Sequence, residues 1–108
     1  MDTTPVRDSD PLKSPLLAPG INIMRTPLCG RSFEYMGEDP YLVSEMVVPL
    51  VQGIEENDVS ACVKHFAVNN QETRRLDVDV EVSERALREI YMPGFEAAVR
   101  RGKAKGIM

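Results

Sequence analysis

Two groups of polar side chains stand out because of the segments in which they lie. Lys64 and His65 interrupt the otherwise apolar stretch 59–68, while Arg31 and Glu34 lie in a loop rich in glycine, proline and aromatic residues. Lys and Arg only donate hydrogen bonds, neutral His can donate or accept, and charge-assisted bonds are the stronger kind. Such side chains could hold a polar ligand. From these residues alone, an ordinary strand end with a solvated lysine and a packed histidine is the simpler interpretation.

The elements that would position these residues alternate between strands, loops and helices. An apolar run at 16–23 predicts a short buried strand that opens into a long loop, 24–37. Loops of that length are uncommon in compact domains unless they carry function. The apolar run 59–68 predicts a parallel strand buried on both faces. A second polar loop follows at 69–81, and the last three residues begin a third strand.

Two amphipathic helices are predicted between these strands. The first has Asp39 as N-cap and Pro40 at its first position, although Pro49 should kink or interrupt it. The second spans 83–100, with Ser83 as N-cap. The apolar face of the first helix comprises Leu42, Val43, Met46, Val47, Leu50, Val51 and Ile54.

The order of these elements predicts an α/β fold with parallel strands. Ligands in such folds bind at the carboxyl ends of the strands, where both polar loops begin. Residues 1–15 are polar, rich in proline and aperiodic, so they predict a flexible leader ahead of the domain at 16–108.

Composition favours a globular protein and argues against nucleic acid as a partner. The chain has 108 residues, of which 43% are hydrophobic and 28% charged, so disorder is not expected for most of it. Its net charge is −4, whereas nucleic-acid binding usually needs a basic patch. The short basic cluster at 100–105 follows a predicted helix, where cations complement the negative end of the dipole.

Targeting signals and metal ligands are not evident in the sequence. No apolar signal segment follows Met1, and no run reaches the roughly 18 residues of a membrane span. We therefore expect no membrane partner and a cytoplasmic location, or a chain that lacks its native start. Cys29 and Cys62 lack metal-type spacing and are expected to be free thiols, although a disulfide stays open. No cofactor or metal is expected.

Three stretches together resemble family 3 glycoside hydrolases, the beta-glucosidase-like group. They are LLAPGINIMRTPLCGRSFEYMGEDPYL (16–42), CVKHFAVNNQETRR (62–75) and VSERALREIYMPGFEAAV (82–99). The resemblance implies an incomplete amino-terminal domain of the family. That is a partial (β/α)8 TIM-barrel-like segment of about three strands and two helices, where a whole barrel takes about 250 residues.

The resemblance also assigns substrate-binding roles. The family's Gly-Arg-x-Phe-Glu arginine falls on Arg31, and its Lys-His-Phe pattern falls on Lys64, His65 and Phe66. In the family the Arg, Lys and His side chains bind hydroxyls of the sugar next to the scissile bond. Because each hydroxyl both donates and accepts, a sugar site needs several polar partners of this kind.

Supporting roles are expected for the neighbouring residues of the same motifs. We expect ion pairs to Arg31 and Lys64 to preorganise the site, with solvated loop charges as the alternative. The supporting residues are Glu34, Phe66, Glu72 and Arg75.

Adjacent strand residues point to opposite faces, yet a shared pocket needs both Lys64 and His65. We therefore predict an irregular backbone at 64–66, either a bulge or a cis peptide that does not precede proline.

No catalytic residue carries over from the resemblance. Retaining glycosidases need a nucleophile and an acid/base carboxyl about 5–5.5 Å apart, and the family's own lie beyond this chain. We expect a fragment of a retaining beta-glucosidase-like hydrolase, which cleaves O-glycosyl bonds of a beta-glucoside or related oligosaccharide, and expect it to be inactive alone. One alternative is a piece that pairs with a separately encoded remainder of the enzyme. The other is a small carbohydrate-binding module.

Overall fold

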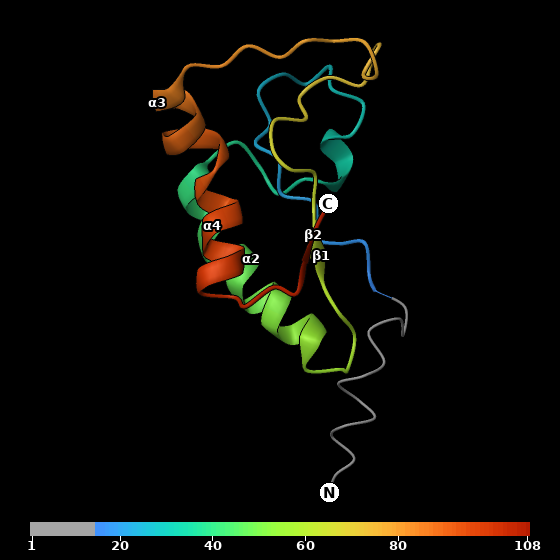
Figure 1. Ribbon diagram of the computed structural model, residues 1–108, viewed down its shortest axis with the longest axis vertical. Helices are drawn as coiled ribbons and strands as arrows, with labels where there is room; N and C mark the ends of the chain where they lie inside the picture. The colour runs from blue at the N-terminus through green and yellow to red at the C-terminus, as the bar shows by residue number, and fades with distance from the viewer. Residues whose placement is uncertain (1–14) are drawn as a thin grey trace, which may run out of the picture.

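The computed structural model describes residues 15–108, in which two helices pack along one side of a small parallel sheet (Figure 1). The predicted leader lies outside the described residues except for its last residue. None of the helices in the described part is long and apolar enough to cross a membrane. The elements are η1 (Ser32–Glu34, 3-10), α2 (Pro40–Glu55), β1 (Cys62–Val63), α3 (Glu84–Ala86), η2 (Leu87–Tyr91, π), α4 (Pro93–Arg100) and β2 (Gly106–Ile107).

The strands are parallel, as predicted, but shorter than the apolar runs. β1 pairs with β2 in the register Cys62↔Gly106 and Val63↔Ile107. On the other side, the residues that flank β1 meet the first predicted strand only at two isolated parallel bridges, Leu16↔Ala61 and Gly20↔Lys64, so that strand is not continuous. The ladder is interrupted there because the Ala18 N–H donates to Leu16 O at 2.8 Å instead of to the neighbouring strand.

Helix α2 begins where its capping residues predict. Asp39 Oδ1 accepts a hydrogen bond from Tyr41 N at 2.9 Å, and Pro40 is the first helical residue. The predicted interruption at Pro49 is wrong, since the helix continues to Glu55. An interior proline costs about 3 kcal/mol. Complete burial of Val47 and Val51 on either side contributes about 1.5–3 kcal/mol each, which offsets that cost.

The second predicted helix is in fact three segments. Ser83 Oγ caps α3 by accepting from Ala86 N at 3.1 Å, as predicted. A single continuous helix is wrong because Pro93 has no N–H to continue the ladder. The turn before it widens to a π-helix, where Met92 N donates to Leu87 O at 2.8 Å, and α4 then begins at Pro93.

The core lies between α2, α4 and the strands. A Cβ built on Gly94 would come within 3.0 Å of Val43 and 3.2 Å of Ile21, so α4 packs closely on both. Only three of the seven residues on the predicted apolar face of α2, Val43, Val47 and Val51, are buried, whereas Leu42, Met46 and Leu50 face solvent. The buried cluster is Ile21, Ile23, Val43, Val47, Val51, Ala61, Val63, Phe95, Ala97 and Ala98.

Candidate functional site

Glu34 links two of the predicted substrate-binding residues just beyond the carboxyl end of β1. Its Oε2 lies 2.5 Å from both Nε and Nη2 of Arg31, and its Oε1 lies 3.0 Å from Lys64 Nζ. Arg31 and Glu34 come from the long loop around η1, and Lys64 immediately follows β1. All three side chains are largely shielded from solvent. One carboxylate therefore fixes the positions of two cations from separate segments.

The same contacts determine the charge of Glu34. Its hydrogen bond to Arg31 and, after that, its contacts with Lys64 hold the pKa of this carboxyl below its usual range against the opposing effect of burial. Glu34 in turn raises the pKa of Arg31. Glu34 is consequently ionised near neutral pH, which suits a residue that positions cations and not one that delivers a proton.

The backbone at 64–66 is irregular, which confirms that prediction. The Lys64–His65 and Phe66–Ala67 peptide bonds are both cis. Met108 N donates to Val63 O at 2.9 Å, and a regular parallel ladder would then have the His65 N–H donate to Met108 O. The Phe66 N–H does so instead, at 2.7 Å. One extra residue is thus accommodated, and Lys64 and His65 contact consecutive residues of one loop, Glu34 and Tyr35.

Asn22 holds this irregular segment, a role that the sequence reasoning missed. The residue is 1% exposed, and its Oδ1 accepts from His65 N at 2.7 Å. Its Nδ2 donates to His65 O at 2.8 Å and to Ala67 O at 3.0 Å. The available signal was an amide side chain inside an otherwise apolar run, because buried polar groups are hydrogen-bonded to something.

Tyr35 and Asn69 were also missed, and they contact the ring of His65. Tyr35 Oη lies 2.9 Å from His65 Nδ1 and accepts a hydrogen bond from Asn69 Nδ2 at 2.7 Å. The rings of Tyr35 and His65 meet edge to face, with centroids 6.0 Å apart. Burial, followed by the charges of Arg31 and Lys64, lowers the pKa of His65. The imidazole is therefore neutral at neutral pH.

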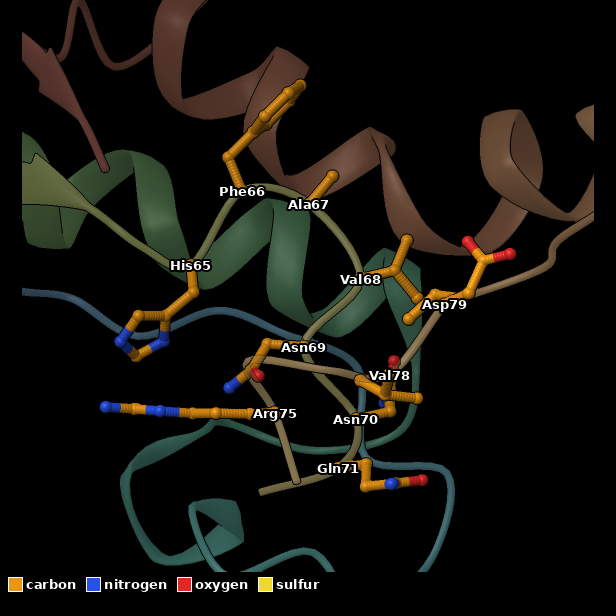
Figure 2. Close-up of a pocket in the computed structure, with 11 residues that line it drawn as sticks. His65, Phe66, Ala67, Val68, Asn69, Asn70, Gln71, Arg75, Val78 and Asp79 are labelled. Carbon is orange, nitrogen blue, oxygen red and sulfur yellow. The ribbon is translucent and has the colours of Figure 1, made fainter. Parts of the chain in front are cut away.

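A cavity of about 450 Å³ lies beside His65 (Figure 2). It is lined by residues 65–71, Arg75 and residues 78–80. In Figure 2 the side chains of His65, Asn69 and Arg75 extend toward the same side, whereas Phe66 points away from them. Phe66 packs edge to face on Phe95 of α4, with centroids 5.2 Å apart. Arg31, Glu34 and Lys64 do not line this cavity. His65 lines it and also follows Lys64 in the chain, so it connects the cavity with the charged cluster.

Comparison with known proteins decides the family. Residues 14–108 match the model described as the glycosyl hydrolase family 3 N terminal domain. The chain belongs to glycosyl hydrolase family 3. The resemblance that the three motifs indicate is thereby confirmed.

Among the relatives of this family 3 chain are beta-glucosidases of several bacteria. It is 65% identical to beta-glucosidase BoGH3A of Bacteroides ovatus over 89% of this chain and 13% of the relative. It is 55% identical to thermostable beta-glucosidase B of Acetivibrio thermocellus over 86% of this chain and 12% of that protein. A solved complex of Thermotoga neapolitana beta-glucosidase 3B with glucose matches with a TM-score of 0.85 and 57% identity, over 88% of this chain and 13% of the other. The family 3 chain thus spans a small part of the length of its relatives.

Glu72 and Arg75, which were expected to form ion pairs with Arg31 and Lys64, pair with each other instead. Glu72 Oε1 lies 3.2 Å from Arg75 Nη1, and neither side chain makes an ion pair with Arg31 or Lys64 within the described residues. Arg75 is half-exposed and reaches the cavity beside His65. Cys29 and Cys62 are both free thiols, as expected from the sequence.

Proposed function

We propose that this chain provides part of the sugar-binding subsite of a retaining beta-glucosidase-like glycoside hydrolase and does not hydrolyse glycosides by itself. The observation that carries the proposal is the cluster in which Glu34 holds Arg31 and Lys64 next to the bulged backbone of His65. The ligand class is a beta-glucoside or a related oligosaccharide. Support comes from the glucose complex of the Thermotoga neapolitana relative.

The cluster suits a sugar because its side chains are held before a ligand arrives. Arg31 and Lys64 are long and flexible, and ordering each on binding would cost about 0.5–1.5 kcal/mol. Glu34 restrains both in the free chain. Charge-assisted hydrogen bonds to sugar hydroxyls can therefore form without that cost.

The catalytic carboxylates are proposed to come from the remainder of a longer enzyme. A retaining mechanism needs one carboxyl as nucleophile and another as acid/base. Glu34 is committed to two cations and has a lowered pKa, so it is a poor proton donor. Glu72 is paired with Arg75. In this proposal the described residues near the site bind and position the sugar, and the catalytic carboxylates come from other segments.

The same proposal includes a fold, a segment of a (β/α)8 barrel. The parallel pairing of β1 with β2, the parallel bridges to 16–20 and the helices along one side of the strands support it. Arg31, Lys64 and His65 follow the carboxyl ends of their strands or extended segments, which is where barrel enzymes bind substrate.

A chimera tests the proposal directly. Residues 16–108 would replace the matching segment of the Bacteroides ovatus beta-glucosidase, and hydrolysis of an aryl beta-glucoside would be measured. We expect an active chimera in which Lys64→Ala lowers kcat/KM by about 10- to 100-fold, the value of one charge-assisted hydrogen bond. Lys105→Ala, at an exposed lysine, is the matched control and should leave kcat/KM unchanged.

Two outcomes would overturn the proposal. One is turnover by the 108-residue chain alone, because the chain's own carboxylates would then suffice for catalysis. The other is an active chimera in which Lys64→Ala and Lys105→Ala behave alike, because Lys64 would then have no part in binding the sugar.

A further inference from the structure

The hydroxyl of Tyr35 lies between two nitrogen atoms, and this arrangement constrains its proton. Tyr35 is 7% exposed, with Oη 2.7 Å from Asn69 Nδ2 and 2.9 Å from His65 Nδ1. An amide nitrogen only donates, so the Tyr35 oxygen accepts from Asn69. Among the described residues His65 Nδ1 is the one acceptor within hydrogen-bond distance of the Tyr35 hydroxyl, so the hydroxyl proton donates to Nδ1, which must then be unprotonated.

We propose that Tyr35, oriented by Asn69, is a positioning residue that holds neutral His65 in the tautomer protonated at Nε2. Nδ1 is occupied by the Tyr35 hydroxyl, and Nε2 makes no hydrogen bond to any residue of the 15–108 segment. Nε2–H therefore serves as the ring's donor to a ligand. Its use on a sugar hydroxyl rests on the function proposed above, whereas the tautomer itself does not.

The charged groups around the ring agree with a neutral imidazole. Arg31 and Lys64 disfavour a third positive charge, and burial does so more strongly. Glu34 and Glu72 act in the opposite direction but rank below those effects. With His65 protonated at Nε2, all three predicted substrate-binding side chains offer only donors. The hydroxyl protons of a bound sugar must then be accepted by groups other than these three.

The tautomer can be read directly because His65 is the only histidine in the chain. Long-range 1H–15N correlation spectra of the histidine-labelled chain distinguish the protonated from the unprotonated ring nitrogen. We expect Nε2 to be protonated and Nδ1 to be unprotonated in the wild type. Tyr35→Phe should give a mixture of tautomers, and Tyr41→Phe, at an exposed tyrosine, should retain the wild-type pattern.

Asn69→Asp provides the sharper test because a carboxylate cannot donate to Tyr35. The Tyr35 hydroxyl should then donate to the new carboxylate and accept from His65, so the proton moves to Nδ1. Protonation at Nδ1 in the wild type would overturn the inference, since it would mean that the Asn69 amide has the opposite orientation. Identical spectra for Tyr35→Phe and Tyr41→Phe would also overturn it.

A glucose titration of the same samples separates this inference from the proposed function. If the wild type shows the Nε2 tautomer but no His65 signal moves with glucose, the positioning role stands and sugar binding by the isolated chain fails. In the chimera, which does not depend on the solubility of the isolated chain, Tyr35→Phe should lower kcat/KM by about tenfold. Asn69→Asp should lower it further, and Tyr41→Phe should not change it. Equal activity of all three variants would count against the role of Tyr35.

Discussion

The side chain of Asn22 makes two hydrogen bonds to the backbone of His65: Oδ1 accepts from His65 N at 2.7 Å, and Nδ2 donates to His65 O at 2.8 Å. These bonds replace the pairing that His65 would have had with a neighbouring strand. A side chain of the adjacent segment thus supplies the hydrogen bonds that a neighbouring strand would otherwise provide. These bonds stabilise the extra residue at the end of β1.

Asn22→Leu should destabilise the chain by about 2–5 kcal/mol. The substitution leaves the part-buried His65 N–H and the carbonyls of His65 and Ala67 without their partner, and each unsatisfied buried group costs about 1–3 kcal/mol before relaxation. Urea unfolding followed by circular dichroism measures the change. Asn57→Ala is the control, because Asn57 is exposed just after α2 and its side chain donates to Gly53 O in the last turn of that helix. Equal midpoints for the two variants would contradict the role of Asn22.

The stability of the chain should fall as pH decreases below neutral, partly through Glu34 and His65. Both groups have a folded-state pKa below the ordinary values of 4.5 and 6.5, so the unfolded chain binds protons first as pH falls. Each contribution is complete above the ordinary value and is lost as pH falls through the folded one. In Glu34→Gln the loss of stability below about pH 5 should be shallower than in the wild type.

Urea midpoints between pH 7 and pH 3 provide the measurement for Glu34. Glu56→Gln removes an exposed carboxyl at the end of α2 and serves as the matched control. A Glu34→Gln profile that runs parallel to that of the wild type would show that the contacts with Arg31 and Lys64 do not favour the ionised form.

Two glycine substitutions should change stability in opposite directions. Gly94→Ala places a methyl group 3.0 Å from Val43 and 3.2 Å from Ile21, and such overpacking costs about 1–3 kcal/mol. Gly53→Ala lies in α2 with nothing within 4 Å of the new atom, so it should stabilise by about 0.5–1 kcal/mol. Thermal unfolding of the two variants provides the comparison. A neutral Gly94→Ala would mean that α4 does not pack closely on Val43.

Pro49→Ala should stabilise the chain by up to about 3 kcal/mol. Pro49 is exposed within α2, and alanine restores a backbone N–H that can donate to Glu45 O. Pro40→Ala, at the first helical position, should have only a small effect, because the N–H there has no helical partner. If both variants unfold at the wild-type temperature, then α2 already accommodates Pro49 without cost.

Local rules predicted the beginnings of elements better than their continuity. Asp39 and Ser83 cap helices as expected because a cap depends on residues within one turn. The apolar periodicity of residues 83–100 suggested one long helix. That periodicity does not show that Pro93 lacks the backbone N–H needed to continue the helical hydrogen bonds. For α2 the periodicity identified both Val47 and Met46 as apolar, but it could not show which of them this chain would cover.

The site was predicted in the same uneven way. The motifs placed Arg31, Lys64 and Glu34 in one group, and the need for Lys64 and His65 on one side predicted the irregular backbone. The roles of Asn22 and Tyr35 were not predicted, because they depend on where the bulged backbone of His65 lies. No local sequence pattern encodes that position. The separate pairing of Glu72 with Arg75 follows from the path of the second loop in space.

The hydrogen bond from Phe66 N to Met108 O determines when the backbone around His65 can form during synthesis. Domains begin to fold during synthesis, starting from the amino-terminal side. Arg31, Lys64 and His65 leave the ribosome well before Met108, whose carbonyl fixes the Phe66 amide beside them. The bulged backbone beside Lys64 and His65 can therefore be completed only after Met108 has been made, when Arg31, Lys64 and His65 have already emerged.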